Sequence, residues 1–218
     1  MNLIETSQAI KEGRTSLGLE LGSTQIKSVL ITDDFETIAS GSYVWENQYK
    51  DGIWTYPLEQ VWDGIRESYK HLAADVFSKY HQPLVKIGAI GVSAMMHGYL
   101  TFSKNGNLLT PFRTWRNNMT EAATDELTEL FGFNIPQRWC IAHLYQAILN
   151  NEEHVAKIDF MTTLAGYVHW QLSGEKVIGI GDASGAFPID EQAGDYNAEF
   201  MDLFSNMEKV KPYPWDIR

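Results

Sequence analysis

The stretch SLGLELGSTQIKSVLI, residues 16–31, decides the fold that we expect for this chain of 218 residues. Two apolar runs flank a short Gly-Ser-Thr turn, and one carboxylate, Glu20, lies inside the first run. An ionised carboxylate in a strand is costly to bury unless a cation or a hydrogen-bond donor meets it. The pattern predicts two strands, residues 16–21 and 27–32, joined by a polar turn, and the partner of Glu20 is the first open question.

The turn has the composition of a small anion site. Gly22, Ser23 and Thr24 can point backbone N–H groups into a concavity that favours phosphate oxygens. A carboxylate just before such a turn, here Glu20, can hold Mg²⁺ through water. The alternative is an ordinary polar hairpin turn with Glu20 at a solvent-facing strand position, and so short a motif does not decide between the two.

The remaining pattern predicts strands followed by a crossover and then helices. A third strand at 37–45 completes an antiparallel meander. Apolar residues recur at helical spacing over 58–77, and the apolar run 84–98 is typical of a buried strand after a crossover helix. The other expected elements are a short amphipathic helix ending near Gly13, a hairpin at Asn105-Gly106, and helices at 120–131, 141–149 and 161–172 with Gly174 as a C-terminal cap. This order indicates an α/β fold with a mixed sheet.

Composition excludes several classes of function. The formal net charge of −11 argues against a nucleic-acid partner, although ATP could bind through backbone amides and Mg²⁺. One cysteine, Cys140, allows no disulfide framework and suits a reducing compartment. No segment has the apolar length of a membrane span, and the N-terminus lacks the pattern of a secretion signal. We therefore expect a cytoplasmic protein.

Four stretches in order resemble the amino-terminal domain of the FGGY family of carbohydrate kinases. LELGSTQIKSVLI (19–31) resembles the first phosphate loop, and AIGVSAMMHGYLTFSKNGNLLTPFRTW (89–115) resembles the Gln-Met-His-Gly strand end, its hairpin and a following Trp. TLAGYVHWQLSGEKVIG (163–179) resembles a helix that ends in a Leu-Thr-Gly-Glu turn, and GDASGAFPID (181–190) resembles an Asp-Ala-Ser-Gly segment. Within the family, the chain resembles the xylulokinase branch.

The resemblance implies an actin-like ATPase, ribonuclease H-like domain: an antiparallel three-strand meander plus parallel strands, flanked by helices. It implies residues 1–15 as an extension and 16–218 as the kinase domain, with a second, ATP-binding domain outside this chain. The implied reaction is Mg²⁺-dependent transfer of phosphate from ATP to a sugar or polyol hydroxyl. The family's catalytic aspartate would lie beyond Arg218, so no catalytic residue is assigned here.

The resemblance also assigns binding residues. Glu20, Gly22, Ser23 and Thr24 take the nucleotide and phosphate positions, with Glu20 as a metal ligand through water. The residues that take sugar-binding positions are Met96, His97, Trp115 and, in a looser match, Arg138.

Departures from the family pattern affect both sites. Glu20 replaces an aspartate, which moves the carboxylate by roughly an ångström. Met95 replaces a Gln, Asn117 an Asp and Met119 an Arg, so the contacts to substrate hydroxyls can differ.

Other interpretations stay open at this point. His97 could be a structural histidine, Trp115 a packing residue and Asp182 a turn or cap. A sugar-sensing protein that kept the fold and lost the chemistry is the main rival function. A nuclease of the same fold type would need carboxylates on a basic face, which the net charge argues against. The sequence leaves the sugar and a homodimer undecided.

Overall fold

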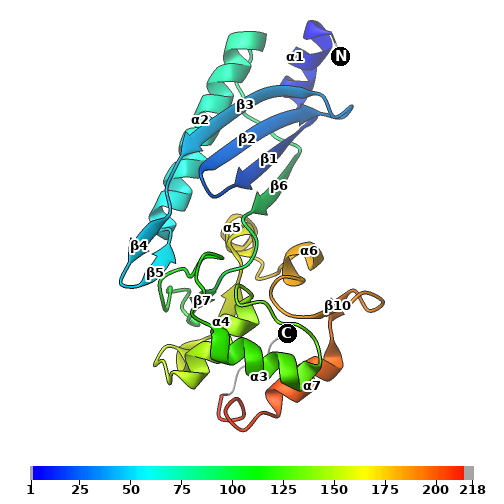
Figure 1. Cartoon of the computed structure of the whole chain (residues 1–218). Helices are drawn as coiled ribbons and strands as arrows, with labels where there is room; N and C mark the ends of the chain where they lie inside the picture. Colours follow the sequence, from blue (N-terminus) through cyan, green and yellow to red (C-terminus); the bar gives the residue numbers. More distant parts are fainter. Residues whose placement is uncertain (1, 214–218) are drawn as a thin grey trace. The chain divides into compact units, whose positions relative to one another are not determined.

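The computed structural model describes residues 2–213, which form two compact units. The first unit comprises residues up to 47 together with 56–95, and the second comprises 48–55 and the residues from 96 onward. Figure 1 shows the course of the chain through the elements of both units. Among residues 2–213, no helix combines the length and the apolar character needed to cross a membrane.

The first unit is built on a four-stranded mixed sheet in the order β3-β2-β1-β6. Strands β1 (Thr15–Leu21), β2 (Gln25–Thr32) and β3 (Thr37–Val44) form the predicted antiparallel meander, and β6 (Ala89–Ala94) pairs parallel to β1. The parallel pair follows a crossover through helix α2 (Leu58–Tyr80), as a parallel connection requires. The mixed α/β architecture expected from the sequence is confirmed.

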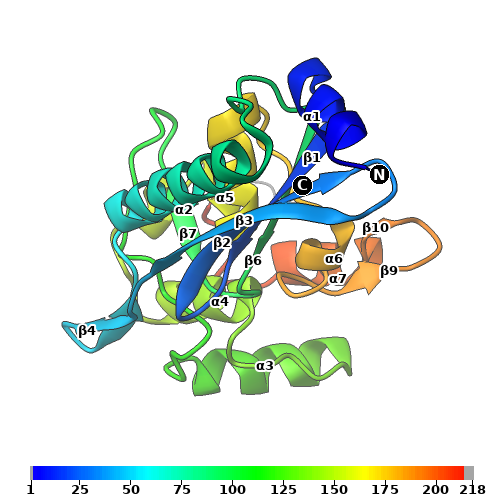
Figure 2. The ribbon, with the colours of Figure 1, turned by 90° about the horizontal axis from the view of Figure 1, so that it is seen from above.

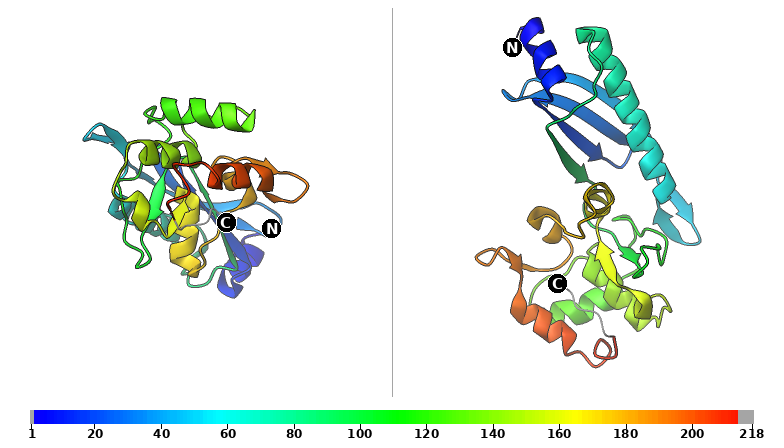
Figure 3. Two further views of the ribbon diagram at one scale, coloured as in Figure 1. Left: turned by 90° about the horizontal axis from the view of Figure 1, so that it is seen from below. Right: turned by 180° about the vertical axis from the view of Figure 1, so that it is seen from behind.

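One face of this sheet packs against α2 (Figure 2). Leu17, Leu19 and Leu21 alternate inward along β1, as the period of a half-buried strand dictates. The helix approaches β3 so closely that a Cβ on Gly41 would lie 2.0 Å from the carbonyl oxygen of Ser68. Helix α1 (Leu3–Glu12), capped by Asn2 and ended by Gly13 in the left-handed conformation, packs beside α2 (Figure 3).

The opposite face of the sheet is uncovered within the described residues. Gly18 and Glu20 of β1, Lys27 of β2 and Gly91 of β6 are exposed there. The prediction that the apolar run 84–98 forms a buried strand is wrong for β6, because Ile90 is 51% exposed although it pairs with the buried Leu17 and lies on the same face. Helix α2 packs mainly against β3 and β2, whereas β6 is the strand at the other edge of the sheet, and this accounts for the exposure of Ile90.

The second unit is mainly helical. Its helices are α3 (Glu121–Phe131), α4 (Cys140–Leu149), α5 (Leu164–Ser173), α6 (Ile180–Ala183) and α7 (Ala198–Ser205), with a 3₁₀ turn η1 (Val155–Lys157). Its short strand pairs are β4 (Gln48–Lys50) with β5 (Ile53–Thr55), β7 (Leu100–Phe102) with β8 (Phe160–Thr162), and β9 (Ile189–Asp190) with β10 (Asp195–Tyr196). The core lies between α3, α4 and α7 and includes Leu127, Ile141 and Phe204.

The predicted hairpin at Asn105-Gly106 is only partly confirmed. The turn forms, with Gly106 at φ 77° and its N–H donating to the Ser103 carbonyl oxygen at 2.8 Å. Its second arm makes only isolated bridges, Phe102 with Leu108 and Tyr99 with Arg113. Strand β7 pairs instead with the distant β8, a tertiary pairing that no local pattern announces.

Candidate functional site

The Gly-Ser-Thr loop of the first unit joins β1 to β2 and is held by two aromatic residues. The Trp45 indole N–H donates to the Gly22 carbonyl oxygen at 2.7 Å. The Trp45 backbone N–H donates to the Thr24 carbonyl oxygen at 3.2 Å. The Tyr56 hydroxyl donates to the Ser23 carbonyl oxygen at 2.6 Å. Ser23 and Thr24 are exposed, so the loop presents its other side to solvent.

Glu20 faces a cation. Lys27 is its direct cross-strand partner, with Lys27 Nζ 3.3 Å from Glu20 Oε2, and the two side chains are 46% and 54% exposed. An exposed pair of this kind contributes little stability, so both groups can be turned toward a ligand at small cost. They line an open hollow of about 400 Å³ whose floor includes Gly18 and Gly91. The carboxylate is thus at a solvent-facing position, as the alternative interpretation had it, but with a lysine beside it.

In the second unit, His97 has a constrained backbone and a fixed ring. Its φ of 67° lies in the left-handed region, which is uncommon for a non-glycine residue. Residues in this conformation are found more often than usual at functional sites. His97 Nδ1 lies 3.2 Å from the Gly185 carbonyl oxygen. Because a carbonyl can only accept, Nδ1 carries the proton and Nε2 is left as an acceptor. A Cβ on Gly185 would lie 2.6 Å from Nδ1, so this contact requires a glycine.

Arg138 and Asp182 complete the surroundings of His97. The Gly98 N–H donates to the Arg138 carbonyl oxygen at 3.2 Å, which places Arg138 beside the histidine. Burial lowers the pKa of His97, and the positive charge of Arg138 lowers it further. Burial also raises the pKa of Asp182, although a hydrogen bond from the Thr163 hydroxyl opposes the rise. Asp182 therefore ties α6 to the start of α5, which agrees with the structural role weighed for it.

Met96 and Trp115 are partly exposed, at 44% and 43%. The Met96 methyl group would lie 3.4 Å from a Cβ on Gly185, so Met96 and His97 flank the same glycine. His97 lies two residues before Tyr99 and Trp115 two residues after Arg113, and Tyr99 and Arg113 form an isolated antiparallel bridge. The structure thus gathers the predicted sugar-binding residues in the second unit and the predicted phosphate-binding residues in the first.

Asn117, which stands where the family pattern has an acid, is buried and structural. Its side-chain oxygen accepts from the Trp54 N–H at 2.9 Å, and its amide nitrogen donates to the Trp54 carbonyl oxygen at 2.8 Å. A carboxylate could not make the second bond, because it has no hydrogen to donate. Asn117 thus fixes the β4–β5 pair to the segment that follows Arg113.

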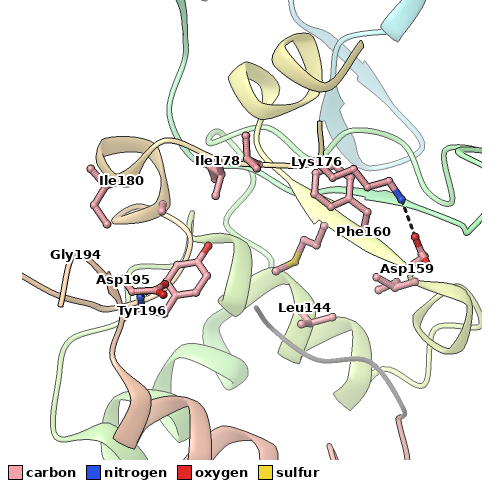
Figure 4. Close-up of a pocket in the computed structure, with 13 residues that line it drawn as sticks. Leu144, Asp159, Phe160, Lys176, Ile178, Ile180, Gly194, Asp195 and Tyr196 are labelled. Carbon is pink, nitrogen blue, oxygen red and sulfur yellow. Dashed lines mark hydrogen bonds and ion pairs between the residues drawn. The ribbon is translucent and has the colours of Figure 1, made fainter. Parts of the chain in front are cut away.

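A separate pocket of about 390 Å³ lies among η1, β8, α6 and β10 of the second unit (Figure 4). Its wall is mostly apolar, including Leu144, Phe160 and Ile178, and its one ion pair joins Lys176 Nζ to Asp159 Oδ2 at 2.7 Å. None of the four predicted sugar-binding residues lines it. An apolar wall with an internally satisfied ion pair does not suit a polyhydroxylated ligand, so we do not assign the sugar to this pocket.

Sequence reasoning missed Lys27, Trp45, Tyr56 and Gly185 as members of these sites. Lys27 could have been found, because the strand register across a short turn pairs it with Glu20. Trp45 and Tyr56 reach the loop from 23 and 33 residues away, and Gly185 reaches His97 from 88 residues away. Such contacts leave no local signal in a single sequence.

Comparison with known proteins identifies relatives whose matched region spans residues of both units. Residues 15–212 match the profile described as the FGGY family of carbohydrate kinases, N-terminal domain. The chain is 23% identical over 209 residues to the glycerol kinase of Thermococcus kodakarensis, covering 90% of this chain and 41% of that protein. It is 28% identical over 194 residues to the gluconokinase of Bacillus subtilis, covering 85% of this chain and 37% of the relative.

Solved structures share the fold. The crystal structure of xylulose kinase from Rhodospirillum rubrum superposes with a TM-score of 0.74 at 21% identity, over 90% of this chain and 42% of that one. The actin-like fold expected from the sequence is thereby confirmed. The chain spans about two fifths of the length of the relatives that it matches.

Proposed function

Because the chain belongs to the FGGY family of carbohydrate kinases, we propose that it is the sugar-binding part of an enzyme that phosphorylates a sugar or polyol hydroxyl with ATP. Residues 16–218 are then the amino-terminal kinase domain, residues 1–15 an extension, and the remaining domain supplies the general base and much of the nucleotide site. The printed activities of the relatives give three substrates to consider: xylulose, glycerol and gluconate.

The observation that carries this proposal is the fixed tautomer of His97. With Nδ1 donating to Gly185, Nε2 accepts a hydrogen bond, and a sugar hydroxyl is a natural donor. The lowered pKa of His97 keeps the ring neutral near pH 7, so the acceptor persists there. The exposed Trp115 offers a flat apolar surface to the C–H face of a sugar.

Arg138 bears on the choice of substrate. Its side chain is exposed. A guanidinium near His97 can donate to a keto oxygen and can pair with a carboxylate. This environment favours xylulose or gluconate over glycerol, which has neither group.

The first unit fits the phosphate end of a nucleotide. Glu20 can hold Mg²⁺ through water, since this ion keeps several waters and takes few carboxylates. When bound, the ion would neutralise phosphate charge. Lys27 supplies a positive charge beside Glu20, and Ser23 and Thr24 supply N–H groups.

The test measures sugar binding by the purified chain. Xylulose, glycerol and gluconate are titrated into ¹⁵N-labelled protein, and the dissociation constant is read from amide shifts near His97. His97→Ala should weaken binding of the preferred sugar about tenfold, the loss of one hydrogen bond and its geometry. The matched control is His169→Ala, which removes an exposed histidine of the same unit and should leave the dissociation constant unchanged.

Two outcomes would contradict the proposal. Binding that His97→Ala leaves intact while the melting temperature falls sharply would make His97 a structural residue. Sugar binding by the native full-length protein without phosphorylation would favour the sensor over the kinase.

A further inference from the structure

Three consecutive carbonyl oxygens of the phosphate loop are occupied by donors from only two residues. Gly22 accepts from the Trp45 indole, Ser23 from the Tyr56 hydroxyl and Thr24 from the Trp45 backbone, at 2.7, 2.6 and 3.2 Å. A turn that only joins two strands needs no such bonds, because exposed carbonyls are satisfied by water. The bonds therefore fix a conformation that the turn itself does not require.

Planar peptide geometry converts these bonds into an orientation of N–H groups. In a trans peptide the C=O of one residue and the N–H of the next point in opposite directions. The Gly22 bond thus turns the Ser23 N–H away from Trp45, and the Ser23 bond turns the Thr24 N–H away from Tyr56. Within residues 2–213, neither N–H has a recorded hydrogen-bond acceptor, so both are available to an anion.

The two aromatic residues are themselves held rigidly. Trp45 is 4% exposed and Tyr56 is 1% exposed, and their rings stack with centroids 4.2 Å apart. Trp45 directly follows β3, while Tyr56 directly precedes Pro57 at the start of α2. The loop is thereby tied to two elements packed against each other, and its conformation is set before any ligand arrives.

We propose that Trp45 and Tyr56 are positioning residues of the nucleotide site, which hold the loop so that the Ser23 and Thr24 N–H groups face the terminal phosphates. The proposal rests on the proposed function, because it takes the loop to be a phosphate site. It also separates two roles at this site. Lys27 and Glu20 carry the charges, whereas the aromatic pair orients the N–H groups of the loop.

The test uses inorganic pyrophosphate as the probe for adjacent phosphates, titrated into the ¹⁵N-labelled 218-residue chain. Tyr56→Phe removes the hydroxyl and keeps the stacked ring, and Trp45→Phe removes the indole donor. Tyr69→Phe is the matched control, because the Tyr69 hydroxyl also donates to a backbone carbonyl of this unit, that of Leu84 at 3.2 Å. Dissociation constants come from the titration, and residual dipolar couplings report the directions of the Ser23 and Thr24 N–H bonds.

We expect Tyr56→Phe and Trp45→Phe to raise the pyrophosphate dissociation constant about fivefold to tenfold, and Tyr69→Phe to leave it unchanged. In the first two variants the couplings of Ser23 and Thr24 should change while those of β1 and β2 stay as in the wild type. Should Trp45→Phe not fold, Tyr56→Phe decides by itself.

Failure of the positioning role and failure of the phosphate loop itself would give different results. Equal pyrophosphate affinity in the wild type and both aromatic variants would overturn the positioning role and leave the phosphate loop standing. A wild-type chain that binds no pyrophosphate would overturn the phosphate loop and, with it, this inference.

Discussion

His143 is fully buried in α4, and neither ring nitrogen has a hydrogen-bond partner among the described residues. Burial, together with the positive charge of Arg113, lowers its pKa to about 3. The unfolded chain has the ordinary value of about 6.5. Between these values the unfolded state binds more protons than the folded state, so the free energy of unfolding falls as the pH drops below about 6.5.

We therefore expect His143→Leu to reduce the acid sensitivity of the chain. At pH 7.5 the variant should be as stable as the wild type or more so, because it removes a buried polar group that is not hydrogen-bonded. Below pH 6.5 the wild type should lose up to about 1.4 kcal/mol per pH unit relative to the variant. Urea unfolding at pH values from 5 to 7.5 measures both; parallel curves would mean that His143 is not buried in its neutral form.

At the scale of elements, the contact between α2 and β3 depends on Gly41. An added Cβ there would meet the backbone, 2.0 Å from the Ser68 carbonyl oxygen and 2.5 Å from the Leu72 nitrogen, so the helix would have to move. We expect Gly41→Ala to destabilise the first unit by about 1–3 kcal/mol, the usual range for overpacking. The measurement is urea unfolding followed through the amide signals of β2.

Gly91→Ala is the control for this change. Gly91 also lies in a strand of the same sheet, but a Cβ there has no atom within 4 Å. Its effect should stay within about 0.5 kcal/mol, as for most surface substitutions. An equal loss in both variants would show that the sheet, and not its contact with α2, is sensitive to the substitution.

The elements that the sequence predicts well are those with a long, clean period. The meander and α2 were predicted to within a few residues because their apolar side chains alternate or recur along many positions. Strands β4 and β5 have three residues each, too few for a period, and β7 owes its partner to the distant β8. The exposure of β6 depends on whether another element covers its face, which a strand's own composition does not determine.

The candidate sites divide in the same way. Glu20 and His97 stand out as candidates because each belongs to a short motif with a chemical meaning. The groups that hold their surroundings have no such motif: Trp45 and Tyr56 bond the Gly-Ser-Thr loop after Glu20, and Gly185 contacts the His97 ring, from distant parts of the sequence. The sequence therefore indicates candidate chemical groups more readily than it indicates the residues that hold them in place.

At the scale of the whole molecule, the chain should bind ligands without completing a reaction. It spans about two fifths of its relatives, and the resemblance places the catalytic base in the part that it does not include. We expect the purified 218-residue chain to release no ADP from ATP and Mg²⁺ in the presence of xylulose, glycerol or gluconate, above a control without protein. A coupled spectrophotometric assay measures this, and any sugar-dependent turnover would place a base within the 218-residue chain.

The chain passes from one unit to the other at three points, after Asn47, Thr55 and Met95. Residues 48–55 belong to the second unit, where Asn117 anchors them through Trp54, although they lie in the sequence between β3 and α2. No single crossover between related genes can therefore replace one unit and leave the other intact. A gene segment encoding the first unit alone would have to omit these eight codons and join Asn47 to Tyr56, so the two units are expected to be inherited as one block.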